Sequence, residues 1–173
     1  MLSFRRATLD DVTALHALVE SAYRGEASRA GWTTEADFLD GQRTDPDELT
    51  TLVRGPTTRL LLAHQDGDLV GCVLLRQEEG CAYLGMLSVR PAVQSAGVGR
   101  ALLDEAERVA RVDLERPEMR MRVVSLRDPL LRWYERRGYA LTGEREPFPY
   151  DDPRSGKPKR DDLEFVVLRK KLA

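Results

Sequence analysis

One segment of the chain, residues 84–103, constrains the fold more than any other. It begins with an apolar run typical of a buried strand, and this run ends before Pro91. A connector with the pattern Gln-x-x-Gly-x-Gly follows, and a helical pattern begins directly after Gly99. The first N–H groups of a helix lack partners within it, and glycines leave such groups uncovered. This order of elements therefore predicts a seat for an anion such as a diphosphate.

The remaining segments predict a mixed α/β domain spanning residues 1–173. Asp66-Gly67 between two apolar runs is a strong hairpin signal, so a meander of antiparallel strands precedes the glycine loop. A strand–helix–strand order follows, which requires parallel pairing in the same sheet. We expect about seven strands, at 2–6, 59–64, 69–75, 81–89, 119–126, 139–143 and 163–168. We expect four or five helices, at 8–23, 34–43, 47–54, 98–109 and 128–137, with 25–33 and 144–162 as connecting loops.

Composition limits the partners of the protein. Lys and Arg total 27 against 29 Asp and Glu, so the formal charge of −2 offers no general attraction for nucleic acid or membranes. No apolar run could span a bilayer and no signal peptide is apparent, which predicts a cytoplasmic location. Cys72 and Cys81 lack metal-ligand spacing, and His16 and His64 are isolated. We therefore expect no metal site, and two reduced cysteines that serve in packing.

Two motifs resemble those of the GNAT family of acyl-CoA-dependent N-acetyltransferases. The first joins Met-Leu-Ser-Val at 86–89 to Pro91 and Gln-Ser-Ala-Gly-Val-Gly at 94–99, and it is similar to the acyl-CoA pyrophosphate loop of that family. The second, Leu-Arg-Trp-Tyr-Glu-Arg-Arg-Gly-Tyr at 131–139, is similar to the family's aromatic helix end. The glycine loop alone is a weak signal. The tyrosine motif about 35 residues later, with the expected elements between, makes the resemblance specific.

The resemblance implies a binding mode for acetyl-CoA as co-substrate. In this family the pantetheine arm enters between two parallel strands that splay apart, here the strand ending at Val89 and the strand at 119–126. Its amides would pair with free backbone groups of the first strand, and the diphosphate would lie on N–H groups of the loop. The predicted cofactor-binding residues are Leu87, Ser88, Val89, Gln94, Ser95, Ala96, Gly97, Val98, Gly99, Arg100 and Arg127.

The chain departs from the family pattern at several positions. Ser95 and Ala96 stand where many relatives have a further glycine, which removes backbone freedom while Ser95 adds a hydroxyl donor. Arg127 and Leu130 replace Asn and Ala, so Arg127 either meets a phosphate or the substrate or is simply solvated. Gln94 and Arg100 are expected to contact phosphate or ribose, with ordinary surface positions as the alternative.

Tyr134 is the predicted proton donor. Amine attack on a thioester expels a thiolate, and a phenol with a pKa near 10 is a suitable donor to that sulfur. The alternative is a core aromatic that packs beside Trp133. An exchange of Tyr134 for Phe should therefore lower turnover and leave acetyl-CoA affinity nearly intact.

The general base is left open by the sequence. Many relatives use a carboxylate on the strand at 83–89, and this chain has none there. Glu35, Asp37 and Asp40 lie where relatives build the acceptor wall, and a water chain ending at a backbone carbonyl is an equal alternative. Trp32 and Glu35 are the predicted acceptor contacts, because an aromatic beside carboxylates suits a cationic amine. Packing of Trp32 onto the sheet is the competing interpretation.

The sequence thus predicts an N-acetyltransferase that moves an acetyl group from acetyl-CoA to a primary amine of a small molecule or peptide. Direct attack in a ternary complex is expected, because no nucleophilic Cys or Ser arrangement is present. A non-catalytic acyl-CoA-binding module or sensor is the alternative, favoured by the missing strand carboxylate. A Rossmann-type nucleotide domain is disfavoured, because the acidic ribose partner about 20 residues on is absent. A homodimer is compatible with such a fold.

Overall fold

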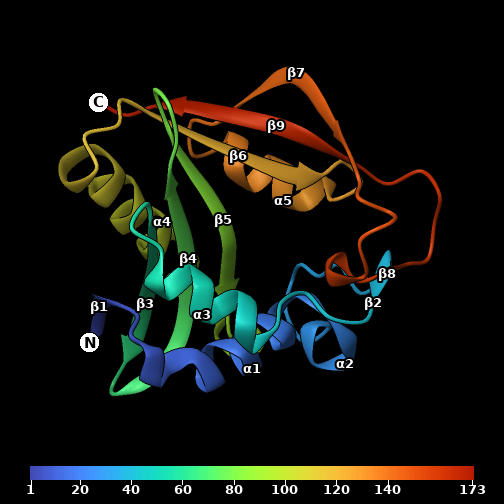
Figure 1. Cartoon of the computed structure of the whole chain (residues 1–173), viewed down its shortest axis with the longest axis horizontal. Coiled ribbons are helices and arrows are strands. Elements are labelled where there is room, and N and C mark those ends of the chain that lie inside the picture. Colours follow the sequence, from blue (N-terminus) through green and yellow to red (C-terminus); the bar gives the residue numbers. More distant parts are fainter.

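A seven-stranded sheet organises the chain, in a computed structural model that describes residues 1–173 (Figure 1). All strand pairs in it are antiparallel except β5 with β6, which is parallel. In order across the sheet the strands are β1 Leu2–Arg6, β3 Thr58–Gln65, β4 Asp68–Gln77, β5 Ala82–Val89, β6 Glu118–Val124, β9 Glu164–Lys171 and β7 Ala140–Pro147. A separate ribbon pairs β2 Leu39–Asp40 with β8 Lys157–Pro158. The mixed sheet confirms the predicted α/β fold class.

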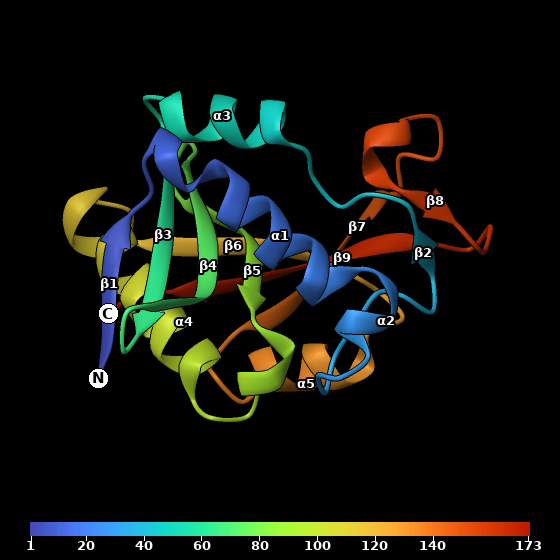
Figure 2. The same cartoon turned by 90° about the horizontal axis from the view of Figure 1, so that it is seen from below.

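Helices cover both faces of the sheet (Figure 2). The five α-helices are α1 Val12–Tyr23, α2 Gly25–Ser28, α3 Pro46–Arg54, α4 Val98–Arg108 and α5 Asp128–Glu135. Leu60 and Leu62 of β3 belong to the apolar cluster under α1 and α3, whereas Leu61 and Ala63 belong to the cluster under α4. Alternate residues of one strand thus face opposite layers, which is why the central strands read as continuous apolar runs.

The two parallel strands separate soon after they meet. Pairing between β5 and β6 is confined to Ala82 and Tyr83, opposite Met119 and Arg120. Figure 1 shows the strands diverging, with β5 running down and β6 running to the right. In β5 a bulge lies at Met86, whose φ is 55°, and it bends the strand further. The predicted splay is confirmed, and we call the gap between residues 85–89 and 121–124 the β5–β6 split.

The capping interactions that begin two of the helices are formed by residues close together in the sequence. Thr8 and Asp11 form the predicted capping box, and the first turn, Leu9–Asp11, is a 3-10 helix that leads into α1. Asp45 caps α3 through the N–H of Glu48, at 2.8 Å. Both cysteines are free and buried, as expected.

Three expected boundaries were wrong. The helix expected at 34–43 is irregular chain that contains β2, because Leu39 packs with Val124 and Phe148 while the backbone pairs with β8. The connector expected at 25–33 contains α2, and the loop expected at 144–162 begins with the last residues of β7. Long-range pairing decided the structure of these segments, and local periodicity does not report it.

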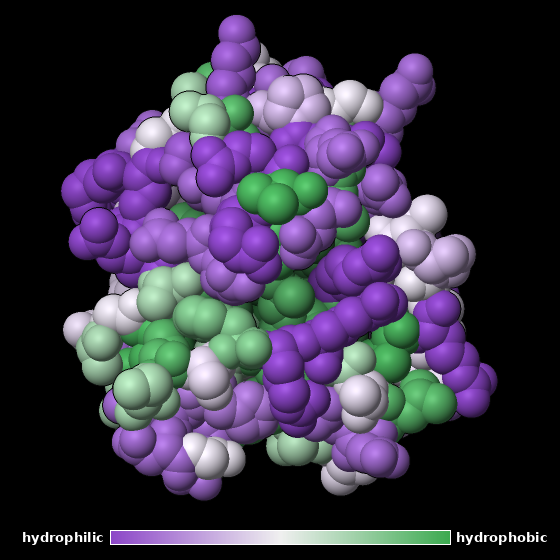
Figure 3. Space-filling view, turned by 90° about the vertical axis from the view of Figure 1, so that its left-hand side faces the viewer, coloured by the Kyte–Doolittle hydropathy of each residue, from purple (hydrophilic) through white to green (hydrophobic).

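Polar residues dominate the upper half of the face on the left of Figure 1, and hydrophobic residues gather among polar ones in its lower half (Figure 3). Charged side chains along β1, such as Arg5 and Arg6, discourage pairing of that edge with another chain. None of the helices is both long and apolar enough to cross a membrane.

Candidate active site

Two adjoining cavities lie at the β5–β6 split. The larger, of about 840 Å³, is lined by residues of β5, β6, β9 and the chain around α3. The smaller, of about 370 Å³, is lined by the glycine loop and α5. Five residues line both cavities, and we call them the neck: Tyr23, Leu87, Arg127, Leu130 and Tyr134. A molecule bound in one cavity would therefore meet a molecule bound in the other at these residues.

The glycine loop presents unpaired backbone donors to the smaller cavity. Two N–H groups of the predicted seat are already used, because Gln94 donates to the Pro91 oxygen and Ala96 to the Val93 oxygen, each at 3.3 Å. The first helical hydrogen bond of α4 is donated by Ala101 to Gly97. The N–H groups left without a backbone acceptor are those of Ser95, Gly97, Val98, Gly99 and Arg100. The anion seat is thus shorter than the sequence predicted.

Backbone conformation explains the glycine pattern of the loop. Gly97 is the N-cap of α4 with φ at 86°, a conformation that only glycine adopts without strain. Ser95 stands where relatives often have glycine and also adopts a positive φ, 71°. At Gly99 an added Cβ would lie 3.5 Å from Val89 and 3.7 Å from Trp133, so glycine here keeps cavity space open.

The charged side chains that line the smaller cavity are all arginines. They are Arg100, Arg127, Arg136 and Arg137, and no carboxylate accompanies them. Arg137 lies over the Trp133 ring at 3.7 Å, burial lowers its pKa, and its buried Nε has no hydrogen-bond partner. Arg100 is exposed and lies 3.8 Å from Asp104. This lining suits a polyanionic ligand.

Some predicted cofactor residues have other roles. The Gln94 side chain donates to the backbone oxygen of Val89 at 3.1 Å and accepts from the backbone N–H of Trp32 at 3.0 Å. It therefore joins two loops. Ser88 is buried outside both cavities, and its hydroxyl donates to the Met86 oxygen at 3.0 Å. The Val98 side chain packs in the core, and Ala96 lines neither cavity. Leu87, Val89, Gln94, Ser95, Gly97, Gly99, Arg100 and Arg127 line the smaller cavity, as the prediction requires.

Tyr134 lies at the neck, at the end of α5. The ring packs edge-on against Trp133 and Tyr139, at centroid distances of 5.0 and 5.7 Å. Gly138, with φ at 89°, lets the chain turn back so that the backbone N–H of Tyr139 donates to the backbone carbonyl oxygen of Tyr134. Burial raises the pKa of Tyr134, and its hydroxyl donates to no protein group. The phenol therefore stays protonated at neutral pH and keeps its proton available.

Glu35 lies deep in the larger cavity between two arginines. It accepts from Arg24 at 2.6 Å and from Arg127 at 3.2 Å, and all three residues are buried. Burial alone would raise the pKa of Glu35, but the charges of Arg127 and Arg24 hold it below its usual value. Arg127 also donates to Thr33 at 2.8 Å, so the solvated alternative for this residue is wrong. A carboxylate held in this way is a poor general base.

The other candidate acceptor residues lie elsewhere. Trp32 lines the smaller cavity instead of the larger one, 6.3 Å from the Trp133 ring, and is 40% exposed. Asp37 pairs with Arg29 at 2.6 Å and Asp40 with Lys159 at 3.3 Å, and neither lines a cavity.

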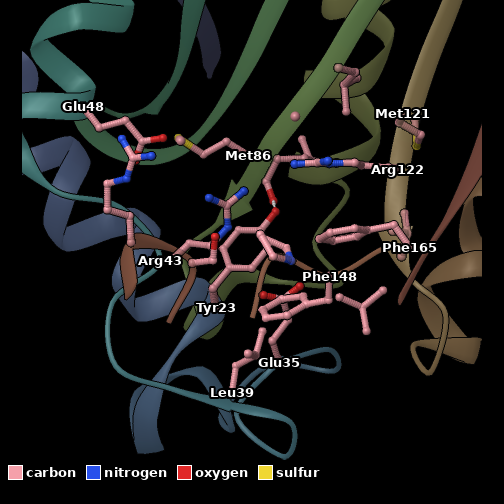
Figure 4. A pocket seen from close by; sticks show the side chains of 18 of the residues that line it. Tyr23, Glu35, Leu39, Arg43, Glu48, Met86, Met121, Arg122, Phe148 and Phe165 are labelled. Carbon is pink, nitrogen blue, oxygen red and sulfur yellow. Dashed lines mark hydrogen bonds between the residues drawn. The ribbon is translucent and has the colours of Figure 1, made fainter. Parts of the chain in front are cut away.

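Sequence reasoning missed most residues of the larger cavity, among them Tyr23, Arg24 and Arg43. Figure 4 shows Tyr23 and Arg43 on one side of it, opposite Arg122 and Phe165. Tyr23 ends an amphipathic helix, and its hydroxyl donates to the Leu87 oxygen at 2.9 Å. No local pattern distinguishes these side chains from ordinary surface positions, because their placement depends on strands far along the chain.

Comparison with known proteins agrees with this arrangement. The family model "Acetyltransferase (GNAT) family" matches residues 14–139. The fold is that of an acetyltransferase, and the chain belongs to the GNAT family. The search of curated proteins found no match.

Solved structures show the same fold over the whole chain. A GNAT-family protein from Desulfovibrio desulfuricans is 22% identical with a TM-score of 0.71, covering 100% of both chains. The ribosomal-protein-S18-alanine N-acetyltransferase from Escherichia coli is 13% identical with a TM-score of 0.74, covering 100% of this chain and 95% of that one. The yncA protein of Salmonella typhimurium, solved with acetyl-CoA, is 18% identical with a TM-score of 0.72, covering 99% and 94%.

Proposed function

We propose that this GNAT acetyltransferase moves an acetyl group from acetyl-CoA to a primary amine by direct attack. The observation that carries the proposal is the neck, where a cation-lined cavity with unpaired N–H groups meets a second cavity beside Tyr134. Acetyl-CoA has phosphates at one end and a thioester at the other, so it suits a site that begins with cations and ends at the neck. The acetyl-CoA in the yncA structure supports this donor.

The open edge of β5 fits the arm of acetyl-CoA. Ser88 is paired with Cys72 of β4, whereas the Leu87 and Val89 oxygens accept from Tyr23 and Gln94 on the opposite side. In a strand the N–H and C=O of one residue point to the same side, so the Leu87 and Val89 N–H groups face the β5–β6 split. These groups are positioned to pair with amides of the ligand. Acetyl-CoA would supply the activated acyl group.

Tyr134 is the proposed proton donor to the departing sulfur. In the reaction a nitrogen–carbon bond forms and the carbon–sulfur bond breaks, while the nitrogen loses one proton and the sulfur gains one. Cys72 is no alternative nucleophile, because burial raises the pKa of its thiol to about 12. Direct attack then depends on holding amine and thioester together at the neck.

The general base is proposed to be water. None of the neck residues is a carboxylate, and Glu35 is held by two arginines. A water chain that ends at a backbone carbonyl remains as the route for the proton. A non-catalytic acyl-CoA-binding module is the second candidate, because such a protein also needs no base at the neck.

A pair of tyrosine variants tests the proposal. Tyr134→Phe should lower turnover by about 10²–10⁴-fold, the usual contribution of general acid catalysis, with the acetyl-CoA Kd nearly unchanged. Tyr139→Phe is the matched control, because Tyr139 is buried 5.7 Å away, donates to Glu107 and lines neither cavity. Release of CoA with a panel of amines separates an enzyme from a binding module. Unchanged turnover in Tyr134→Phe would remove Tyr134 from the mechanism.

We further infer one catalytic domain over residues 1–173, acting in the cytoplasm on a small-molecule or peptide amine. We also predict that the protein can form a homodimer and that it has no nucleic-acid partner. Sedimentation of the protein and its thermal shift with acetyl-CoA address the oligomeric state and the donor.

A further inference from the structure

Arg43 is an arginine in the larger cavity that has no carboxylate partner. Its guanidinium lies 5.0 Å from the centre of the Tyr23 ring and makes no side-chain hydrogen bond or ion pair. Every other arginine that lines this cavity is paired with a carboxylate: Arg24 and Arg127 with Glu35, Arg122 with Glu146, and Arg154 with Asp152. A guanidinium has five N–H donors, so a cation–π contact leaves most of the binding capacity of Arg43 unused.

The buried charged residues that line the larger cavity are two arginines and one carboxylate, Arg24, Arg127 and Glu35. Glu35 is shared by two buried arginines, and the Nε atoms of both Arg24 and Arg127 are buried without a partner. Glu48 lies on the same side of the cavity, but its carboxylate accepts from the Thr44 hydroxyl at 2.5 Å and forms no ion pair. The other carboxylates of the lining, Asp45, Asp47, Glu48 and Asp152, lie at exposed or half-buried positions, and none of them forms an ion pair with Arg43. A ligand with a negative group would find the guanidinium of Arg43 free to pair with it.

The anion position lies close to the reacting position. The Tyr23 ring has Arg43 at 5.0 Å and Arg127 at 5.6 Å, and its hydroxyl is fixed to the Leu87 oxygen at the neck. An acceptor that reaches from Arg43 to the neck therefore extends along Tyr23, with its anionic group at one end and its amine at the other. A polyamine or aminoglycoside would instead place a positive charge beside the unpaired guanidinium of Arg43, which opposes binding at that position.

The far wall of the larger cavity is built of apolar side chains, with the Arg122 guanidinium stacked on the Phe165 ring at 4.4 Å and paired with Glu146. Figure 4 shows Met121, Phe148 and Phe165 lying across from Tyr23 and Arg43. Phe148 and Phe165 pack together with a centroid distance of 5.8 Å, and Phe148 is buried. This wall suits an uncharged, apolar side chain on the acceptor.

We propose that the acceptor is an amine with a neighbouring anionic group and an apolar side chain, as in an α-amino acid, and that Arg43 binds the anionic group. This inference rests on the proposed acetyl transfer, in which the nitrogen–carbon bond forms, the carbon–sulfur bond breaks, the nitrogen loses one proton and the sulfur gains one. The apolar side chain lies toward Phe148 and Phe165, and the amine faces Tyr134 and the split.

The experiment measures CoA release from acetyl-CoA by the full-length enzyme. The twenty common amino acids and spermidine are assayed first, and each amino acid used is then compared with its amide and its decarboxylated amine. The three compounds share a side chain and differ in the anionic group and in the amine pKa, so kcat/KM is compared per unprotonated amine. We expect apolar amino acids to be used, with kcat/KM at least tenfold higher than for the amide or the decarboxylated amine.

Variants then assign the effect to Arg43. Arg43→Gln should raise KM for the amino acid at least tenfold, while kcat/KM for its amide and the acetyl-CoA Kd stay unchanged. Arg154→Gln is the matched control, because Arg154 lines the same cavity but is already paired with Asp152, and its KM should change less than twofold. Arg43→Lys, which keeps the charge and loses the planar donor set, should restore part of the affinity.

The outcomes separate this inference from the proposed function. Turnover confined to spermidine or to amines without an anionic group overturns the acceptor class and leaves the acetyltransferase intact. Equal losses for acid and amide in Arg43→Gln overturn the role of Arg43. If acetyl-CoA does not bind, measured by calorimetry, the proposed function itself fails.

Discussion

The buried cluster of Arg24, Glu35 and Arg127 makes a strong stability prediction. Glu35→Gln keeps the size of the side chain and removes the only carboxylate that compensates two buried guanidiniums. Breaking a buried ion pair from one side typically costs about 3–5 kcal/mol, because the remaining charge stays buried without a partner. For a chain of 173 residues this corresponds to a fall in Tm of roughly 6–20 °C.

Urea unfolding at pH 7, followed by circular dichroism, measures this loss. Asp37→Asn is the matched control, because Asp37 forms an exposed ion pair with Arg29 and its loss should leave Tm unchanged. A loss below about 1 kcal/mol in Glu35→Gln would refute the argument that Glu35 compensates the two buried charges.

The same cluster predicts how stability changes with pH. The two arginines hold the pKa of Glu35 in the folded protein below the ordinary value of 4.5. A lowered folded-state pKa means that the stabilisation is fully present above pH 4.5 and is lost as the pH falls through the lower value. Wild type and Glu35→Gln should therefore converge in stability in acid, as measured by urea unfolding at several pH values.

Three further predictions concern the glycine loop and the first helix. Ser95→Val should cost about 1–2 kcal/mol in urea unfolding, because a β-branched residue is strained at the positive φ of this position, whereas Ser95→Gly should cost nothing. Gly99→Ala should weaken acetyl-CoA binding in calorimetry, because its Cβ enters the smaller cavity. Its Tm should stay close to that of wild type, since the added Cβ meets only ordinary contacts. Asp11→Ala should cost about 1 kcal/mol through loss of the cap. Because hydrogen bonding to Arg5 lowers the pKa of Asp11 to about 2, that contribution should disappear between pH 3.8 and about 2.

The sequence predicted the parts of the fold that depend on local pattern. The capping box at Thr8, the Asp66-Gly67 hairpin and the start of α4 each follow from a few adjacent residues, and each was found. The glycine loop lines the smaller cavity, and its unpaired N–H groups could be anticipated because those of a helix start are a local property.

The acceptor side could not be predicted in the same way. The segment at 34–43 has a helical pattern, yet its structure depends on pairing of β2 with β8, more than a hundred residues later. Arg127 and Glu35 are 92 residues apart, so neither reveals its partner in the sequence. Arg43 is informative only because nothing pairs with it, and that fact exists only in three dimensions.

The absence of a carboxylate at the neck leads to a prediction about the pH dependence of catalysis. If water removes the amine proton, the rising limb of kcat/KM against pH follows the pKa of the free acceptor, because this ratio reports free enzyme and free substrate. Tyr134 adds no falling limb below pH 10, since burial raises its pKa. The limb should lie near pH 8 for the α-amine of a peptide, should lie higher for a free amino acid, and should move by the same amount as the amine pKa when a second acceptor of different basicity is used. A limb fixed near pH 6–7 with both acceptors would instead identify a titrating base on the protein and contradict the water route.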